Sequence, residues 1–264
     1  MPVEDYEQFK KLFVRLTGID LSLYKEEQMK RRLKTLLVKR QMPSFQAYYK
    51  HLCHSEEMLE ECLNRITINV TEFFRNRPRW DVLEKKLADA FASKRRLTVW
   101  SAACSTGEEP YSIAMMLAKH LPLEKFSVIA TDVDREVLKK AKEGRFTERA
   151  LSSLTLDEKQ RFFHKDGLIY AIDERLKKTI AFQYNNLLSD PAPGQFDVIV
   201  CRNVLIYFTE EGKQTIYQKM ARALKEDGIL FVGSTEQIFH PENYALKPAE
   251  TFFYEKTKAE GLAK

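Results

Sequence analysis

The chain has 264 residues, enough for one large domain or for a domain plus a smaller one, and its formal net charge is +5 at pH 7. Its 44% hydrophobic residues are typical of a globular protein. No apolar run is long enough to span a membrane, and the acidic first residues lack the apolar core of a signal peptide. The 4 cysteines and 5 histidines form no metal-ligand spacing. We therefore expect reduced thiols, a cytoplasmic location and no bound metal.

Residues 4–66 repeat apolar side chains at helical spacing and contain no strand pattern, which predicts a separate all-α domain. Its second predicted helix, residues 25–40, has seven lysines and arginines against two glutamates, mostly off the apolar stripe. This charge is either a solvated helix face or a docking surface for an acidic protein or a nucleic acid. Aromatic residues are not interleaved with it, which disfavours single-stranded nucleic acid.

A linker follows at residues 67–75, and we place the first domain boundary at its end, giving domains 1–75 and 76–264. Asn69 and Thr71 are candidate helix caps, the two phenylalanines before Arg75 are candidate core residues, and Arg75 can reach a site. One helix is predicted after the linker, beginning at Arg77-Pro78 and ending near residue 93.

The stretch Val99–Ser112 is the centre of the second domain, because it reads as strand, small-residue loop and helix. Small residues let a backbone approach a ligand closely. The loop lacks the GxGxxG pattern, and Glu108 and Glu109 suit hydroxyls or a cation better than a pyrophosphate. Asp132 ends the second predicted strand, some 25 positions after Gly107, where a carboxylate can accept hydrogen bonds from ribose hydroxyls. The small-residue loop and Asp132 together favour a bound nucleoside over a plain turn between strand and helix.

The alternation of strand and helix breaks at about residues 144–184. Two strand-like runs there, 167–172 and 179–184, predict a small antiparallel insertion at the sheet edge. The amides that follow, Asn185 and Asn186, either read an adenine edge or make a turn.

A strand at 196–201, apolar except for Asp197, leads into Arg202, Asn203 and Tyr207, which we therefore expect at the carboxyl end of the sheet where ligands bind. The alternative is that Tyr207 is a core residue and Asn203 a cap. A helix at 210–225, a strand at 229–232 and a hairpin at 246–255 complete the predicted fold.

Six motifs now coincide in chain order, and together they closely resemble the CheR family, the bacterial chemotaxis receptor methyltransferases, over nearly the whole chain. They are Asn69-Val-Thr-Glu-Phe-Phe-Arg75, the stretch from Trp100 to Ser112, Ala130-Thr-Asp-Val-Asp134, Asn186-Leu-Leu, the stretch from Phe196 to Phe208, and Gly228-Ile-Leu-Phe-Val-Gly-Ser. The resemblance implies an α/β, Rossmann-like, S-adenosylmethionine-dependent methyltransferase domain with a small antiparallel β subdomain inserted, preceded by an all-α N-terminal domain.

The resemblance also implies roles for individual residues. The cofactor S-adenosylmethionine, or its product S-adenosylhomocysteine, would be bound without a metal. Its binding residues would be Asn69, Thr71, Arg75, Ala103, Glu109, Asp132, Asn186, Leu187, Arg202, Asn203 and Val204. Asp132 would hold the ribose and Asn186 and Leu187 would flank the adenine. Arg75 and Tyr207 would lie nearest the transferred methyl group and act as the catalytic residues.

By the same resemblance, the substrate would be glutamate side chains on the cytoplasmic helical region of methyl-accepting chemotaxis receptors. The enzyme would be cytoplasmic, at receptor clusters on the membrane, with no membrane insertion and no nucleic acid partner. Some relatives carry a glycine-containing insertion that tethers them to a receptor's C-terminal peptide. His164–Tyr170 has one glycine and no such insertion, so we expect recognition without that tether.

Other functions fit the sequence less well. A nucleic-acid methyltransferase would use the basic helix on phosphates, but Arg202-Asn-Val-Leu stands where an Asn-Pro-Pro-Tyr-type motif would be expected. A non-catalytic receptor adaptor is disfavoured because Asp132, Glu109, Arg75 and Tyr207 are all present. A nicotinamide dehydrogenase would need a glycine-rich phosphate loop.

Overall fold

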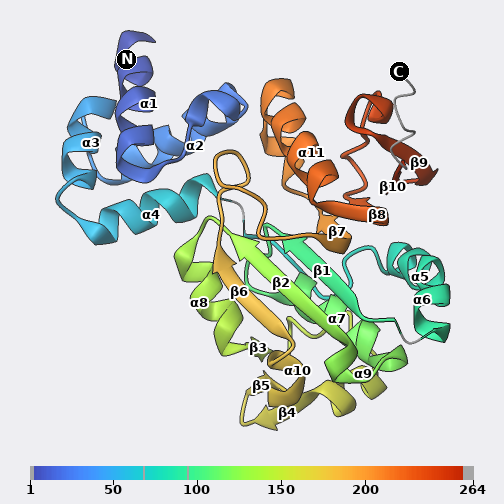
Figure 1. Ribbon diagram of the computed structural model, residues 1–264. Coiled ribbons are helices and arrows are strands. Elements are labelled where there is room, and N and C mark those ends of the chain that lie inside the picture. Colours follow the sequence, from blue (N-terminus) through green and yellow to red (C-terminus); the bar gives the residue numbers. More distant parts are fainter. Residues whose placement is uncertain (1–2, 68, 94, 258–264) are drawn as a thin grey trace, which may run out of the picture.

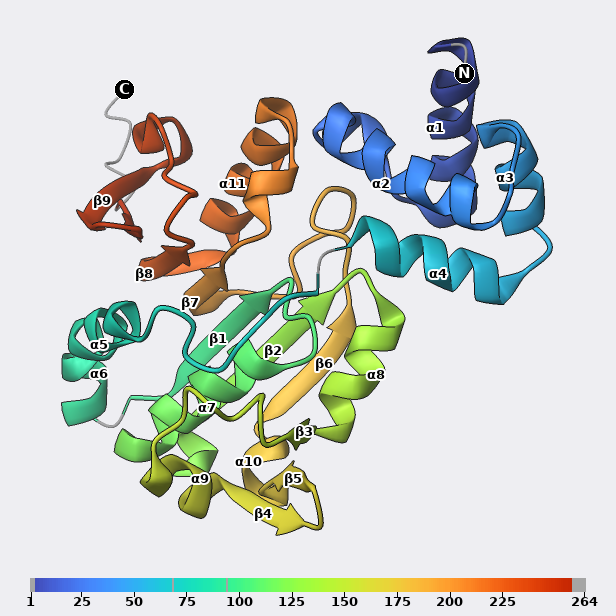
Figure 2. The ribbon, with the colours of Figure 1, turned by 180° about the vertical axis from the view of Figure 1, so that it is seen from behind.

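The computed structural model describes residues 3–67, 69–93 and 95–257 (Figure 1). A group of N-terminal helices precedes an α/β part that is built on a seven-stranded sheet. Figures 1 and 2 show the N-terminal helices beside one end of that sheet and a second, smaller sheet at the opposite end.

Four helices and one 3₁₀ turn form the N-terminal part, as the apolar spacing predicts. They are α1 (Val3–Thr17), η1 (Leu21–Leu23), α2 (Glu26–Lys39), α3 (Phe45–Leu52) and α4 (Glu56–Ile66). Their apolar stripes meet in one core that includes Phe9, Phe13 and Leu33. Asp5 joins α1 to α3, because its carboxylate accepts the N–H groups of Phe45 at 2.9 Å and of the next residue at 3.1 Å.

The large sheet has the strand order β6-β2-β1-β7-β8-β10-β9. Its strands are β1 (Leu97–Ala102), β2 (Phe126–Asp132), β6 (Ile180–Tyr184), β7 (Phe196–Cys201), β8 (Leu224–Val232), β9 (Leu246–Glu250) and β10 (Phe253–Lys256). The first five strands in that order pair in parallel, and β10 pairs antiparallel to both β8 and β9. The chain order reverses between β1 and β7, which is the position where open α/β sheets bind ligands.

Both faces of the sheet are covered, so its central strands are mostly buried and mostly apolar. Alternate side chains point to opposite cores: Val99 and Val198 to one core, Trp100 and Ile199 to the other. Helices contribute to the two cores from each side of the sheet. They are α5 (Arg77–Lys86), α6 (Ala88–Ala92), α7 (Glu108–His120), α8 (Arg135–Glu143) and α11 (Glu210–Ala223).

The predicted pairing of the insertion was wrong. The run at 179–184 becomes β6, which pairs in parallel with β2 in the large sheet. The small antiparallel sheet has the order β3-β5-β4, with β3 (Arg145–Thr147), β4 (Phe163–Asp166) and β5 (Ile169–Ile172). Short helices α9 (Leu156–Phe162) and α10 (Glu174–Lys177) complete this region. Two of its strands have three or four residues and are partly polar, so no periodicity reveals them.

Smaller corrections concern element ends. The helix predicted after the linker is broken at Leu87 into α5 and α6, and its basic end includes residue 94, which is outside the described residues. Helix α11 ends at Ala223, and β8 already begins at Leu224. The predicted C-terminal hairpin is confirmed as β9 and β10. Within the described ranges, no helix is long and apolar enough to cross a membrane.

Candidate active site

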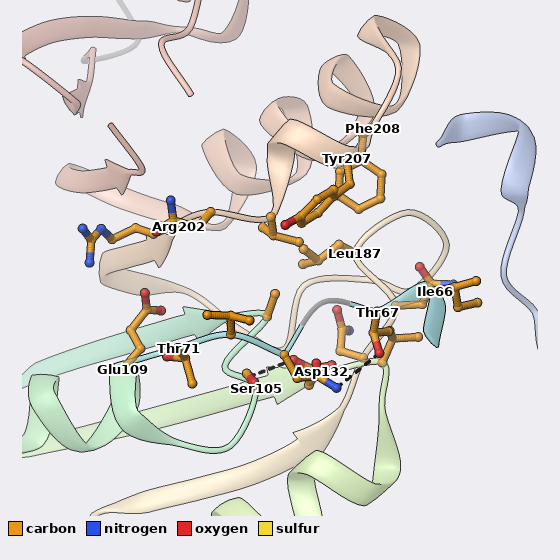
Figure 3. A pocket seen from close by; sticks show the side chains of 18 of the residues that line it. Ile66, Thr67, Thr71, Ser105, Glu109, Asp132, Leu187, Arg202, Tyr207 and Phe208 are labelled. Atoms are coloured by element: carbon orange, nitrogen blue, oxygen red, sulfur yellow. Dashed lines mark hydrogen bonds between the residues drawn. The ribbon is translucent and has the colours of Figure 1, made fainter. Parts of the chain in front are cut away.

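A cavity with about 1060 Å³ of space, its mouth included, lies at the carboxyl ends of β1, β2 and β7. Every candidate site residue from the sequence lines it: Asn69, Thr71, Arg75, Ala103, Glu109, Asp132, Asn186, Leu187, Arg202, Asn203, Val204 and Tyr207. Figure 3 shows Glu109 and Arg202 at one end, Ile66 and Thr67 at the other, and Tyr207 facing Asp132 across the cavity. The structure thus brings together residues that are more than 130 positions apart in sequence.

The loop between β1 and α7 lets the backbone approach the cavity, as its small residues predict. Ala103 has φ +64°, Ser105 has φ +50° and Gly107 has φ +101°, all in the left-handed region. A Cβ on Gly107 would lie 3.1 Å from the Ala141 Cβ, so glycine allows α7 and α8 to pack closely. The loop is held to β2, because the Cys104 N–H donates to the Thr131 carbonyl at 2.9 Å.

Asp132 lies at the end of β2 and is 7% exposed. Its two oxygens accept the N–H groups of Ser105 at 2.8 Å and of Asp134 at 3.0 Å, which fixes the carboxylate beside the cavity. Burial outweighs these hydrogen bonds and raises the pKa of Asp132 to about 6. A carboxylate held in this way keeps lone pairs available for the hydroxyl groups of a ligand.

Glu109 projects from the first turn of α7, and Ser101 Oγ donates to its Oε1 at 2.8 Å. Enclosure in the cavity raises the pKa of Glu109 to about 7, although Arg202 and Arg75 act in the opposite direction. Two desolvated carboxylates, Glu109 and Asp132, make this cavity suited to a ligand with hydroxyl groups and a positive charge. The residues present therefore fit S-adenosylmethionine.

The linker closes one side of the cavity and is fixed at both ends. At its start, Asp134 Oδ2 accepts the hydroxyl of Thr67 at 3.1 Å and the amide of Asn69 at 3.1 Å. At its end, the Arg75 carbonyl accepts Arg202 Nη2 at 2.7 Å and Trp80 Nε1 at 3.1 Å. The Arg75 side chain is half-buried at the cavity and donates to the carbonyl of Val70 at 3.2 Å.

Arg202 is buried, and its guanidinium lies 4.6 Å from the ring centroid of Phe231 and 5.6 Å from that of Trp80. Arg202 follows β7 directly, and its Nη2 donates to the Arg75 carbonyl. Arg202 therefore connects the linker to the end of β7. Sequence reasoning did not find this connecting role, for which no local motif exists.

Asn186 lines the cavity, but its amide already bonds to protein. Nδ2 donates to the Gly18 carbonyl at 3.1 Å, and Oδ1 accepts the Leu188 N–H at 3.0 Å. Each of these two groups keeps one further hydrogen-bonding site, so contact of Asn186 with adenine stays a prediction. Leu187 also lies on the cavity wall (Figure 3).

The helical domain also contributes to the cavity, which could not be predicted from the sequence. Ile19 and Tyr24 line it, and the Tyr24 and Phe208 rings have centroids 4.7 Å apart. The backbone adds two hydrogen bonds across the same contact, from Lys25 N to the Tyr207 carbonyl at 2.9 Å and from Thr209 N to the Leu23 carbonyl at 2.9 Å. Nothing local in the sequence pairs these segments.

Comparison with known proteins identifies the class first. The family model described as CheR methyltransferase, SAM binding domain, matches residues 69–253, and that of the CheR methyltransferase all-alpha domain matches residues 4–67. The chain is thus an S-adenosylmethionine-dependent methyltransferase with a Rossmann-like domain and an all-α N-terminal domain.

The relatives then show the family. The chain is 44% identical to the chemotaxis protein methyltransferase of Listeria monocytogenes over 256 residues, 96% of this chain and 98% of that one. It is 35% identical to the chemotaxis protein methyltransferase of Escherichia coli, over 90% of this chain and 85% of that one. The chain belongs to the CheR methyltransferase family. Among the described residues, no group of three or more His, Cys, Asp or Glu side chains is placed to hold a metal ion.

Proposed function

We propose that this protein transfers a methyl group from S-adenosylmethionine to glutamate side chains in the cytoplasmic helical region of chemotaxis receptors, forming methyl esters. The names of its relatives support a role in chemotaxis. The charge around the cavity mouth supports the choice of an acidic acceptor.

One observation carries the choice of an anionic acceptor. Arg31 and Arg32 of α2 and Arg65 of α4 border a shallow groove that extends to Thr67 at the rim of the cavity. The Arg32 guanidinium also lies 5.0 Å from the ring centroid of Tyr207, and its Nη1 donates to the Ile66 carbonyl at 2.7 Å. A substrate that reaches Tyr207 along this groove passes three arginines, which favours an acidic segment.

The cofactor roles follow the geometry of the cavity. Asp132 would hold the ribose hydroxyls, and Glu109 would lie near the positive charge of the methionine end. Asn69, Thr71, Arg75, Ala103, Asn186, Leu187, Arg202, Asn203 and Val204 would form the remaining walls. When bound, S-adenosylmethionine supplies a methyl group activated on a sulfonium.

The protein's part in the chemistry is placement. A glutamate carboxylate has a reference pKa of about 4.3, so it is ionised at neutral pH and needs no general base. Its oxygen bonds to the methyl carbon while the carbon–sulfur electron pair returns to sulfur, so no proton moves. Positioning two reactants can lower a barrier by roughly 7–11 kcal/mol. We assign this positioning to Tyr207 and Arg75, with Tyr207 as the hydrogen-bonding partner of the carboxylate.

The partner and its location complete the proposal. The enzyme would act in the cytoplasm, at receptor clusters, without entering the membrane and without binding nucleic acid. It would not need the receptor's C-terminal peptide, so full-length and tail-truncated receptors should bind equally. A large loss on truncation would contradict this part.

The test is transfer of labelled methyl from S-adenosylmethionine to a receptor cytoplasmic fragment, with RNA in a parallel reaction. Label that mild base releases as a volatile product identifies a carboxyl methyl ester and supports the proposal. Base-stable label in RNA would instead indicate a nucleic-acid enzyme. Arg65→Ala should raise KM for the receptor fragment about 3- to 10-fold and leave binding of S-adenosylhomocysteine unchanged.

A further inference from the structure

The buried carboxylate of Glu236 contacts the backbone of the segment that carries Asn203 and Tyr207, and it has no part in the methyl transfer proposed. Glu236 is 4% exposed and follows β8, in the segment that begins Gly233-Ser234. It does not line the cavity, whereas Asn203, Val204 and Tyr207 do.

Glu236 accepts four backbone hydrogen bonds, two on each oxygen. Oε2 accepts the N–H groups of Asn203 at 2.6 Å and Gly233 at 2.8 Å. Oε1 accepts those of Leu205 at 2.6 Å and Ile206 at 3.3 Å. One donor, Asn203, lies in the turn after β7, and two, Leu205 and Ile206, lie in η3 (Leu205–Tyr207), so one side chain holds both the turn and the start of η3.

That turn has a conformation that needs such support. Asn203 has φ +60°, in the left-handed region that non-glycine residues adopt at a cost. Bonds to the N–H groups of Asn203 and Leu205 hold the backbone on both sides of Val204. Their common acceptor is a buried charge, which makes these hydrogen bonds strong ones.

Gly233 lies at the same contact, next to Glu236 and the backbone of Asn203. A Cβ at Gly233 would collide with Glu236 Oε2 and lie 2.8 Å from the Asn203 nitrogen. Only a residue without a side chain lets the two backbone segments and the carboxylate come together at this point.

We propose that Glu236 is a positioning residue for methyl transfer. Through its four backbone hydrogen bonds it holds Asn203 against the cofactor and Tyr207 against the acceptor carboxylate. This inference rests on the proposed function for the role of Tyr207. Its effect on Asn203 is independent of the acceptor.

The main test is Glu236→Gln, which keeps the shape but replaces one acceptor oxygen with a donor that faces backbone N–H groups. We expect kcat for the receptor fragment to fall about 10- to 100-fold, per site that binds S-adenosylhomocysteine, as for a displaced catalytic group. Glu242→Gln is the matched control, because Glu242 is an exposed carboxylate of η4 (Pro241–Tyr244) outside the cavity. It should leave kcat unchanged.

A double-mutant cycle separates positioning from folding. If Glu236 acts through Tyr207, then Tyr207→Phe should slow the wild-type enzyme but change the Glu236→Gln enzyme less than about 2-fold. Effects that multiply, or a Glu236→Gln enzyme with wild-type kcat, would overturn the inference. If Glu236→Gln does not fold, Glu236→Asp, which keeps the charge and shortens the reach, takes its place in the same cycle with the same criteria.

The effect of Glu236 on Asn203 can be tested without an acceptor, by calorimetry of S-adenosylhomocysteine binding. Glu236→Gln and Asn203→Ala should each weaken binding, and the double variant should bind as weakly as the weaker single variant. Additive losses would overturn the Asn203 part. If the wild-type enzyme transfers no methyl group to the receptor fragment while this coupling is present, then the proposed acceptor is wrong and the positioning of Asn203 stands.

Discussion

Two glutamates in this molecule, Glu158 and Glu109, have pKa values that are shifted in opposite directions. Glu158, at the start of α9, is 2% exposed and bonded to Arg77 at 2.6 Å and Lys119 at 2.9 Å. Burial alone would raise its pKa, but these two cations lower the pKa of Glu158 to about 2. Glu109, in the cavity, has a pKa raised to about 7. Glu158 therefore stabilises the fold, whereas Glu109 carries a desolvation cost that a bound cation would offset.

The position of Glu158 explains its pairing. Its carboxylate completes a capping box with Thr155, and Arg77 also donates to the Ser153 carbonyl at 3.1 Å, so the cluster joins the start of α5 to the α9 region. The Arg77 guanidinium lies 4.2 Å from the ring centroid of Phe74. Phe74 precedes Arg75, so this paired cluster also supports the linker that closes the cavity.

The largest effect is expected from breaking the paired region. Glu158→Gln leaves Arg77 and Lys119 without their carboxylate, and we expect a loss of about 3 kcal/mol in the free energy of unfolding. Urea denaturation at pH 7 measures it. Glu174→Gln is the control, because its pair with Lys177 is largely exposed and should contribute less than about 1 kcal/mol. Equal losses in both variants would contradict the comparison.

In the cavity, Asp132→Asn should affect binding more than folding. It removes acceptor capacity from the predicted ribose contact, and we expect the Kd of S-adenosylmethionine to rise roughly 30-fold, or about 2 kcal/mol. Calorimetric titration measures the Kd. Unchanged affinity would rule out the ribose assignment of Asp132.

The desolvation of Glu109 should make the free energy of unfolding depend on pH. Burial raises the pKa of Glu109 from 4.5 to about 7, so its contribution to stability is favourable at low pH and is lost as the pH rises through this window. Glu109→Gln should therefore stabilise the protein without cofactor at pH 8 by about 1 kcal/mol and have little effect at pH 5. Thermal unfolding at both pH values tests this.

The control for that series is Glu143→Gln, an exposed carboxylate at the end of α8, which should shift Tm by the same small amount at both pH values. A Glu109→Gln protein that is less stable than wild type at pH 8 would show that Glu109 is effectively paired in the free enzyme.

The smallest effect concerns the charge of the ligand. S-adenosylmethionine has a positive sulfonium that S-adenosylhomocysteine lacks, so its binding should gain more from ionised Glu109 and Asp132. Their pKa values are raised to about 7 and about 6, so the affinity ratio of the two ligands should fall a few-fold between pH 8 and pH 5.5. Parallel titrations at the two pH values measure the ratio. A ratio independent of pH would mean that neither carboxylate senses the sulfonium.

Much of this protein could be predicted from sequence because the relevant signals are local. Helical periodicity defined the N-terminal helices, and apolar runs defined β1, β2 and β7. The spacing of Gly107 and Asp132 predicted a ligand site, and the structure places Asp132 at the end of β2 and Gly107 in the loop that follows the neighbouring strand β1. The motifs then selected the residues that line the cavity, although the chemical role of each remains a prediction.

Tertiary structure decided what local patterns leave open. The run at 180–184 has the same alternation whether it pairs in a hairpin or in parallel, and packing beside β2 selects the parallel partner. Tyr24, Glu236 and Glu158 act through partners far along the chain, at Phe208, Asn203 and Arg77. Hydrogen bonds and ion pairs of this kind depend on distances in the folded molecule, and so does the desolvation that separates the pKa of Glu109 from that of Glu158.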